Sequence, residues 1–487
     1  MKTRLKQFFI VLLGTAIVAG CDTSISKNNQ DPSSGTADFS TFVAIGDSLT
    51  AGYADGALYR QIQESSLPSI MAQQFRRAGG GAFTQPLMPM HATGSLTWGM
   101  LDLGRPDRLM AVSTGNPDSP VAPAPIVPAI SSDIVAEGAP GLYNNIGVPG
   151  AKIFHAPVGG YGNPMGLPAA ANPYFVRFAS GLGASMLGDA IAQAPSFFMI
   201  WLGSNDILLY AADGADPTVN MESVTPLANM TAAFDVILPA LKTANNKGLI
   251  INIPDVTSIP YFNTVPYNAI PLDEAQAQAL NLTLAATNNA VVNGAGLGPT
   301  ETAQRQLSYS AGMNPVLIVD ELLTPLAPLG PLAQARPATP EDFILLPAAP
   351  MIGEVEPTAT APFDTWGVSL PLRDRDVLTE REVTLEIEAV RVPFNEYIEG
   401  QAAGDPDLVF YDAAARLIEL NENGISYGSG GVTSAFIQGG FFSLDGIHPT
   451  ARGYAVIANE VFSIINDNFD AFIPPVDPNQ YTTIHFQ

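Results

Sequence analysis

The stretch FVAIGDSLTAGY, residues 42–53, joins a short apolar run to a polar turn. Thr41 to Ile45 shows no alternation of apolar and polar residues, as expected for a strand that is buried on both faces of a sheet. The run ends in Gly-Asp-Ser, and the residues after it favour a helix. The stretch therefore predicts a parallel strand, a turn and a helix, with Ser48 at the carboxyl edge of the sheet, where open α/β sheets bind ligands.

Other apolar runs of the same kind lie further along the chain. They cover residues 195–202, 248–253 and 408–411, with a weaker run at 142–146. Helix-like patterns lie between and after them, at residues 229–244, 272–292, 379–402 and 451–465. Thr379, followed three residues later by Glu382, is a capping-box signature. This alternation of strands and helices predicts an α/β sheet with right-handed crossovers.

Two segments do not fit the alternation. Residues 79–140 are rich in Gly, Pro and small apolar residues, and residues 310–375 contain several apolar runs. Both are too long for ordinary connections, and their apolar content argues against disorder. We expect them to be insertions that pack at the carboxyl edge of the sheet and wall the site. For the run PVLIVD at 315–320, a core strand is the alternative.

Four short blocks carry the residue types that acyl transfer needs. They are FVAIGDSLTAGY at 42–53, NNIGVPGAK at 144–152, WLGSNDIL at 201–208 and DGIHPT at 445–450. Ser48 offers a hydroxyl nucleophile, which needs a base to take its proton. His448 suits that base, and Asp445, three residues earlier, would orient its ring. Gly150 offers an unhindered N–H and Asn205 a side-chain amide, both of which can stabilise an oxyanion.

Each of these residues also has a structural interpretation when it is taken alone. Ser48 suits a helix N-cap, Asp445 an Asx-type turn, Gly150 a Pro-Gly turn, and Asn205 a cap at the end of a strand. The presence of all four blocks in one order favours the catalytic interpretation. The other three histidines lack such a setting, and we expect them at surface or structural positions; they are His91, His155 and His485.

The four blocks resemble those of the SGNH or GDSL hydrolases, a family of serine esterases and lipases. The first and last blocks fit closely, whereas the third has Ser204 where relatives often carry another small residue. The resemblance implies a flavodoxin-like three-layer α/β/α sandwich with a mostly parallel sheet. It also implies a catalytic triad and an oxyanion hole, formed respectively by Ser48, Asp445 and His448 and by the Ser48 N–H, Gly150 and Asn205. Asp47, Asn145 and Asp206 are expected to order their blocks without taking part in a chemical step.

The N-terminus has the layout of a secretory signal. A basic start precedes an apolar run, Phe8 to Ala19, that is too short to span a bilayer. VAGC at 18–21 resembles a bacterial lipobox, in which the signal of residues 1–20 is removed and Cys21 is lipidated. Cys21 is the only cysteine in the sequence, and lipidation explains an unpaired thiol in an exported protein. An ordinary signal peptide with an incidental cysteine is the alternative.

The expected organisation follows from these features. Residues 21–39 are polar and turn-rich and suggest a flexible tether. Residues 40–475 would form one hydrolase domain with the two insertions, and residues 476–487 a C-terminal tail. We expect a protein of the cell envelope, held by lipid at the outer membrane or on the periplasmic face rather than by a spanning helix.

Composition and motifs narrow the possible partners. With 21 basic and 46 acidic side chains the formal net charge is −25, which argues against nucleic acid. The sequence shows no metal-ligand spacing and no nucleotide-binding motif, so no metal or other cofactor is expected.

The sequence therefore predicts an ester hydrolase that works through an acyl-enzyme. The apolar insertions favour a substrate with an apolar acyl group, such as a lipid ester. One alternative is a carbohydrate acetyl esterase, which needs aromatic platforms, and the chain offers only Trp98, Trp201 and Trp366. Another is a catalytically silent lipid-binding lipoprotein on the same fold.

Overall fold

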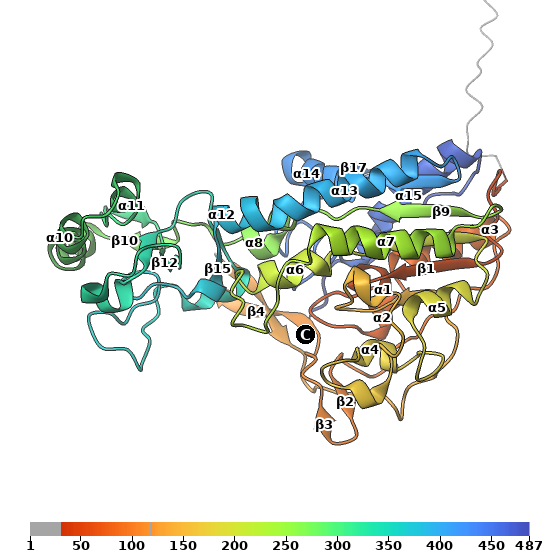
Figure 1. Ribbon diagram of the computed structural model, residues 1–487, viewed down its shortest axis with the longest axis horizontal. Coiled ribbons are helices and arrows are strands. Elements are labelled where there is room, and N and C mark those ends of the chain that lie inside the picture. Colours follow the sequence, from red (N-terminus) through yellow and green to blue (C-terminus); the bar gives the residue numbers. More distant parts are fainter. Residues whose placement is uncertain (1–30, 117–118, 487) are drawn as a thin grey trace, which may run out of the picture. The chain divides into compact units, whose positions relative to one another are not determined.

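The computed structural model describes residues 31–116 and 119–486. Within these ranges, strands and helices alternate around one central sheet (Figure 1). The predicted signal and Cys21 lie outside the described residues. No helix in the described part of the chain is both long and apolar enough to cross a membrane.

The central sheet has five strands, all parallel. Its order is β16 (Leu408–Tyr411), β9 (Lys247–Ile251), β8 (Phe197–Trp201), β1 (Phe42–Gly46) and β7 (Asn145–Gly147). All five predicted apolar runs supply a strand. Every residue of β1 and β8 is buried, as their unbroken apolar patterns predict for a sheet that is covered on both faces.

The longer helices pack in two groups. Helix α3 (Leu67–Arg77) contacts α15 (Ala451–Phe469), whereas α7 (Leu227–Leu241) contacts both α5 (Met186–Ile191) and α13 (Glu388–Ala403). Helices from both groups, α15 and α13, contact strand β16 (Figure 1). The chain is thus a mixed α/β protein, as predicted, and its arrangement is compatible with a three-layer α/β fold.

Helix α15 follows the last block, and its sequence explains why it forms there. The Thr450 hydroxyl accepts a hydrogen bond from the Gly453 N–H at 3.0 Å and so caps the first turn. The apolar side chains recur at helical spacing, and Tyr454, Ala458 and Ile465 are fully buried. This burial against α3 and β16 anchors the loop that directly precedes the helix.

The second insertion leaves the central sheet and builds small sheets of its own. Its run at 315–320 forms β12 (Leu317–Val319), which pairs antiparallel with β13 (Ala335–Pro337). The alternative of a core strand is therefore wrong. The physical reason is local burial, because Val316, Ile318 and Leu372 pack into a separate apolar cluster within the insertion.

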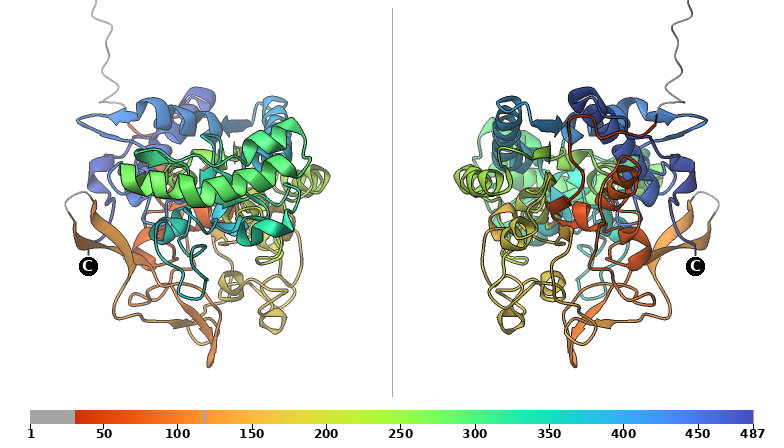
Figure 2. Two further views of the ribbon diagram at one scale, coloured as in Figure 1. Left: turned by 90° about the vertical axis from the view of Figure 1, so that its left-hand side faces the viewer. Right: turned by 90° about the vertical axis from the view of Figure 1, so that its right-hand side faces the viewer.

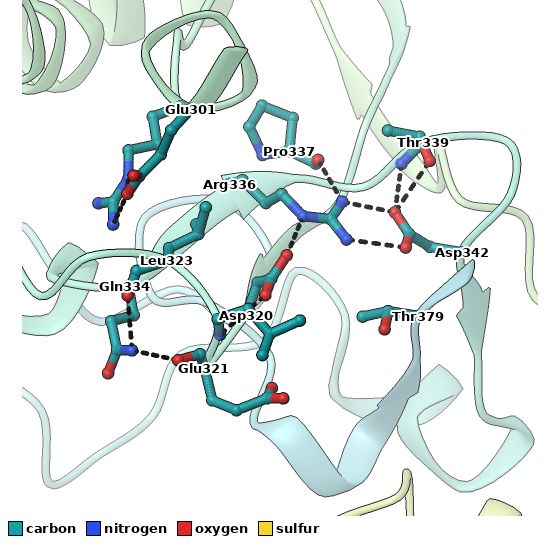
Figure 3. Close-up of polar contacts among 12 residues, drawn as sticks. Glu301, Asp320, Glu321, Leu323, Gln334, Arg336, Pro337, Thr339, Asp342 and Thr379 are labelled. Atoms are coloured by element: carbon teal, nitrogen blue, oxygen red, sulfur yellow. Dashed lines mark hydrogen bonds and ion pairs between the residues drawn. The ribbon is translucent and has the colours of Figure 1, made fainter. Parts of the chain in front are cut away.

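An ion-pair network holds this insertion together (Figure 3). Arg336 Nε donates to Asp320 at 2.6 Å, and its two terminal nitrogens donate to the Asp342 carboxylate at 2.6 and 2.9 Å. Burial raises the pKa of Asp342, but the facing guanidinium outweighs burial and holds that pKa below its usual range. All three nitrogens of Arg336 donate to groups of the insertion itself, so the network is structural.

The first insertion contains the antiparallel hairpin of β4 (Leu109–Asn116) and β5 (Ser119–Pro125). The C-terminal tail packs along it, because the Ala111 N–H donates to the carbonyl of His485 at 2.7 Å. Both views in Figure 2 show the last described residues beside this orange hairpin. The predicted tail is therefore part of the folded body up to residue 486.

Residues 33–39, the last part of the predicted flexible tether, are folded onto the domain. Ser33 pairs with Phe472 through two backbone hydrogen bonds of 3.0 and 2.8 Å. Phe39 is buried and stacks on Phe75 with ring centroids 3.9 Å apart. The expectation is wrong for residues 33–39, because the segment's polar average hides two apolar side chains, Ala37 and Phe39, that are buried in the core.

Candidate functional site

The first and last blocks meet at the carboxyl edge of the sheet. Ser48 follows β1 and begins helix α1 (Ser48–Ala51), and His448 lies 400 positions later in the loop before α15. His448 Nε2 lies 2.9 Å from Ser48 Oγ, and His448 Nδ1 lies 2.9 Å from Asp445 Oδ2. The three predicted side chains form a line of hydroxyl, imidazole and carboxylate, which is the geometry that lets a base activate a serine.

Asp445 is held as an anion by several donors. Its Oδ1 accepts hydrogen bonds from the N–H groups of Ile447 at 2.8 Å and His448 at 2.9 Å, and its Oδ2 accepts one from the Gly56 N–H at 2.9 Å. Burial raises the pKa of Asp445, but His448 and these N–H groups outweigh it and lower the pKa to about 2. An ionised Asp445 places the imidazole proton on Nδ1 and leaves Nε2 free to accept the Ser48 proton. The Asx-type turn expected for this residue coexists with that role.

The turn around Ser48 is built by its neighbours. Asp47 Oδ1 accepts a hydrogen bond from the Leu49 N–H at 2.9 Å and caps helix α1, as predicted. A Cβ at Gly46 would lie 1.9 Å from the Thr50 hydroxyl oxygen, so this position requires glycine. Within the described part of the chain, the Ser48 N–H donates no hydrogen bond and stays available.

Asp47 has one carboxylate oxygen that is buried without a partner in the described part of the chain. Its side chain is fully buried, and its Oδ2 has no hydrogen-bond partner among the described residues. Burial raises the pKa of Asp47 to about 7, although the Leu49 N–H and the charge of His448 oppose the rise. The folded protein therefore keeps a proton on Asp47 that the unfolded chain loses near its ordinary pKa of 3.8.

We expect Asp47→Asn to gain stability relative to wild type as the pH rises from about 4 to about 7. In that interval the folded wild type binds more protons at this position than the unfolded chain does, so its free energy of unfolding falls with pH, by at most about 1.4 kcal/mol per pH unit. The asparagine side chain does not titrate, so the variant lacks this pH dependence. Urea unfolding at several pH values measures the difference, with the exposed Asp467→Asn as control. Parallel curves for wild type and Asp47→Asn would contradict the assignment.

The second and third blocks supply candidate oxyanion donors. Gly150 occupies a turn closed by the Ala151 N–H on the Val148 carbonyl at 3.0 Å, and its φ of 78° favours glycine. Its N–H donates no hydrogen bond to any residue that the structure describes. Asn205 begins helix α6 (Asn205–Ala212), and its Nδ2 donates to the Ala151 carbonyl at 3.1 Å. That bond ties the two blocks together and leaves the second N–H of the amide for another acceptor.

The order of the strands explains why the three blocks converge. Strand β1 lies between β7 and β8, and Ser48, Gly150 and Asn205 each follow one of these adjacent strands. Because parallel strands have their carboxyl ends at one edge, the turns after them share that edge.

The three expected ordering residues make the contacts that this role requires. Besides the cap from Asp47, Asn145 Nδ2 donates to the Thr50 carbonyl at 3.1 Å and so joins the first and second blocks. Asp206 Oδ2 accepts a hydrogen bond from the Ile153 N–H at 2.7 Å, just after the second block. Burial raises the pKa of Asp206 to about 6, although the Ile153 N–H opposes the rise.

An apolar cavity opens beside Ser48 and His448. Its lining comes mainly from loops after the central strands and from α14 (Ala413–Asn423), and includes Leu49, Leu208, Ile253, Val256, Leu417 and Ile425. No residue of 79–140 or 310–375 lines it. For this cavity the expectation that the insertions wall the site is wrong, because elements of the central domain supply the lining. In the sequence, the apolar face of residues 413–423 was the feature that could have indicated the lining of this cavity.

Sequence reasoning assigned no role to Tyr53, although it ends the first block. Its ring lies against the His448 imidazole, with centroids 4.7 Å apart. Its hydroxyl donates to the Gly56 carbonyl, and the Gly56 N–H in turn bonds Asp445. The Tyr53 ring therefore packs on one side of the His448 imidazole.

The other side chains that could bind a metal lie away from Ser48, His448 and Asp445. His155 Nδ1 accepts a hydrogen bond from the Lys152 N–H at 3.0 Å, and burial lowers its pKa to about 4, which fits the structural role expected for it. Among the described residues, Glu321, Asp374 and Glu382 bring carboxylate oxygens within 4.8 Å of one another. Burial and the neighbouring carboxylates raise the pKa of Asp374 to about 8.

Comparisons of the chain with protein-family models, with curated proteins and with solved structures gave no match. A function for this protein therefore has to rest on the geometry of the site. That geometry comprises a hydroxyl, an imidazole and a carboxylate in line, two candidate N–H donors on adjacent turns, and an apolar cavity beside them.

Proposed function

We propose that the protein is a carboxylic ester hydrolase that uses Ser48, His448 and Asp445 as a catalytic triad. The observation that carries the proposal is the pair of 2.9 Å contacts that link Ser48 Oγ to His448 and His448 to Asp445. The Ser48 hydroxyl is buried and contacts one ring nitrogen of His448, and the other ring nitrogen faces the ionised Asp445. This arrangement prepares the hydroxyl for nucleophilic attack.

The reaction follows from this geometry. Ser48 Oγ attacks the ester carbonyl while His448 Nε2 takes its proton, and Asp445 stabilises the imidazolium without accepting the proton. The oxyanion is stabilised by the N–H groups of Ser48 and Gly150 and by the Asn205 amide. His448 then returns the proton to the departing alcohol. Water, activated by His448, hydrolyses the acyl-enzyme, releases the acid and restores Ser48.

The strand order supports a flavodoxin-like three-layer fold and, with it, the resemblance to the SGNH hydrolases. When the five strands are numbered along the chain, their order across the sheet is 2-1-3-4-5, which is the flavodoxin-like order. In that order ligands bind at the carboxyl edge between strands 1 and 3, here β1 and β8, where Ser48 and Asn205 follow their strands.

The cavity supports an ester with an apolar acyl group as the substrate. Its lining is almost wholly apolar, and it adjoins the nucleophile. A carbohydrate acetyl esterase would need exposed aromatic platforms beside Ser48, but Trp201 is buried and Trp366 belongs to the second insertion. A silent lipid-binding protein would use the same cavity but would have no use for the aligned triad.

Activity on a graded series of para-nitrophenyl esters tests the proposed function. We expect the highest kcat/KM for butyrate or a longer chain, because the acyl group fills the cavity. An optimum at acetate would reject the apolar acyl assignment, and no hydrolysis of any ester would reject the enzyme in favour of a binding protein.

Asn205→Ala should lower kcat by about 10²- to 10³-fold, because one donor to the oxyanion is lost. KM should change little, since the amide acts on charge that develops only in the transition state. Steady-state kinetics on para-nitrophenyl butyrate gives both constants. Asn421→Ala, an exposed amide on α14 that donates to the Ser258 carbonyl, is the control. A loss confined to KM would contradict the assigned role.

The predicted export and lipid anchor complete the proposal. Cleavage before Cys21 and lipidation of its thiol would place the enzyme in the cell envelope, on a membrane surface close to lipid esters. Intact mass of the protein purified from membranes tests this, and Cys21→Ser should release the protein into the soluble fraction.

A further inference from the structure

Arg105 stands unpaired in a strongly acidic protein. The chain has 46 acidic and only 21 basic side chains, yet among the described residues Arg105 forms no ion pair and donates no hydrogen bond. Its Nε is shielded from solvent and without a partner. Its guanidinium lies over the ring of Tyr174, with Cζ 5.6 Å from the ring centroid. Arg105 as a whole is half-buried, and a bound anion would give its shielded Nε an acceptor.

The Tyr174 hydroxyl is a second unused donor beside Arg105. Tyr174 is 2 % exposed, and its hydroxyl has no hydrogen-bond partner among the described residues. Burial raises the pKa of Tyr174, and the Tyr53 hydroxyl lies close enough to oppose the rise as a hydrogen-bonding neighbour. Tyr53 donates its own proton to the Gly56 carbonyl, however, and the geometry between the two hydroxyls does not make a hydrogen bond. A buried hydroxyl normally finds a partner, so a polar ligand is the natural acceptor.

These two groups adjoin the catalytic line through Tyr53. The Tyr53 ring packs on His448 at 4.7 Å and on Tyr174 at 6.4 Å between centroids. Burial raises the pKa of Tyr53 well above its usual value, and the positive charge of Arg105 is among the influences that oppose the rise. Arg105 is thus close enough to act electrostatically on the residue that touches the base.

Arg105 is also linked to the oxyanion turn. Tyr161 accepts a hydrogen bond from Asn172 Nδ2 at 3.1 Å, and the same nitrogen donates to the Pro149 carbonyl at 2.8 Å, next to Gly150. Burial raises the pKa of Tyr161 to about 12, with Asn172 and the charge of Arg105 opposing the rise. The contacts place the guanidinium over Tyr174, whose ring contacts Tyr53, and Tyr53 in turn contacts the base.

This polar group is separate from the apolar cavity. Arg105, Tyr53, Tyr161 and Tyr174 contribute nothing to the lining of the cavity, whereas His448 belongs to that lining and also touches Tyr53. In ester hydrolysis the base delivers its proton to the departing alcohol. If the acyl chain occupies the cavity, the alcohol side of the ester extends past His448 towards Tyr53, Tyr174 and Arg105.

Arg177 provides an instructive contrast. Arg177 is buried, faces no carboxylate of the described residues within ion-pair distance, and has an unpaired Nε like Arg105; burial lowers its pKa to about 10. Its two terminal nitrogens, however, donate to the carbonyls of Pro86 and Leu87 at 3.2 and 3.0 Å. Arg177 fixes the chain, whereas Arg105 has no such structural use.

We propose that Arg105 and Tyr174 form a subsite for an anionic group, a carboxylate or a phosphate, on the alcohol side of the ester. This inference rests on the proposed function and specifies its substrate class as an ester with an apolar acyl chain and an anionic alcohol portion. The guanidinium can grip either oxyanion with two parallel hydrogen bonds, and the Tyr174 hydroxyl adds a third donor.

The test compares matched esters that differ only in charge on the alcohol side. The substrates are para-(butanoyloxy)benzoate, its neutral methyl ester, and para-(butanoyloxy)phenyl phosphate. Comparing the two anionic esters shows whether the subsite prefers a carboxylate or a phosphate. The wild type should prefer at least one anionic ester over the neutral one by about tenfold in kcat/KM, as one charge-assisted contact allows. Arg105→Met should remove this preference, and Tyr174→Phe should reduce it by about threefold.

Arg108→Met is the matched control, because it removes the same charge from the same segment. Arg108 lies over the ring of Tyr59, 4.7 Å from its centroid, rather than over Tyr174, so this variant should keep the anionic preference. A wild type that favours the neutral ester, or a preference that survives Arg105→Met, would overturn the subsite while leaving the esterase intact. Failure to hydrolyse the neutral ester as well would overturn the proposed function itself.

Discussion

Ser48→Ala should abolish ester hydrolysis, lowering kcat by about 10⁴- to 10⁶-fold. The substitution removes the only group placed to form the acyl-enzyme and leaves His448 with no proton to accept. Any residual rate would come from the oxyanion donors and from substrate binding. Steady-state and single-turnover kinetics on para-nitrophenyl butyrate measure the loss, and thermal unfolding checks that the variant is folded.

Ser204→Ala is the control for this prediction. Its hydroxyl is buried beside Asn205 and has no hydrogen-bond partner among the described residues. Its removal should change kcat by less than about threefold, because an unpaired hydroxyl stabilises nothing that can be lost. A folded Ser48→Ala variant that keeps a tenth or more of wild-type activity would show that another residue is the nucleophile.

Asp445→Asn should lower kcat by about 10⁴-fold with little change in KM. An asparagine amide facing His448 Nδ1 would donate to that nitrogen, so the imidazole proton would move to Nε2 and the base could no longer accept from Ser48. An Asn Oδ1 can still accept the N–H bonds of Ile447 and His448, but the amide nitrogen cannot accept the Gly56 N–H, so we also expect some loss of stability. Kinetics with a parallel thermal unfolding curve separates the two effects.

A neighbouring buried carboxylate offers the comparison for Asp445. Asp55 accepts hydrogen bonds from Tyr59 at 2.6 Å and from the Leu444 N–H at 3.0 Å, but it does not touch the imidazole. Asp55→Asn should therefore cost stability more than turnover. Equal losses of kcat in the two variants would mean that Asp445 is only a structural residue.

Local chemistry made much of the fold and of the triad predictable. Runs such as 42–46 and 197–201 are apolar without alternation, short, and followed by turn residues, which together favour strands of a sheet buried on both faces. Asp445 and His448 are three residues apart, so their contact is a property of one turn. Ser48 and His448 are 400 positions apart, but the parallel sheet brings the strand end and the loop before the last helix to the same edge.

The remaining features depend on contacts that no local pattern contains. Phe39 lies in a polar segment and is buried only because Phe75 presents a ring to it. Leu417 lines the cavity because α14 follows β16 at the site edge, whereas the more conspicuous apolar run at 315–320 packs within the insertion. Arg105 stands out only once the structure shows that no carboxylate faces it.

Labelling by a fluorophosphonate, followed by peptide mass mapping, tests the central claim most directly. The reagent reacts with a serine only when a base has activated its hydroxyl. We predict one adduct on the folded wild-type protein, on Ser48, and at least about a hundredfold slower labelling of His448→Ala. An absence of adduct on the folded wild type, or equally fast labelling of the His448→Ala variant, would contradict the account.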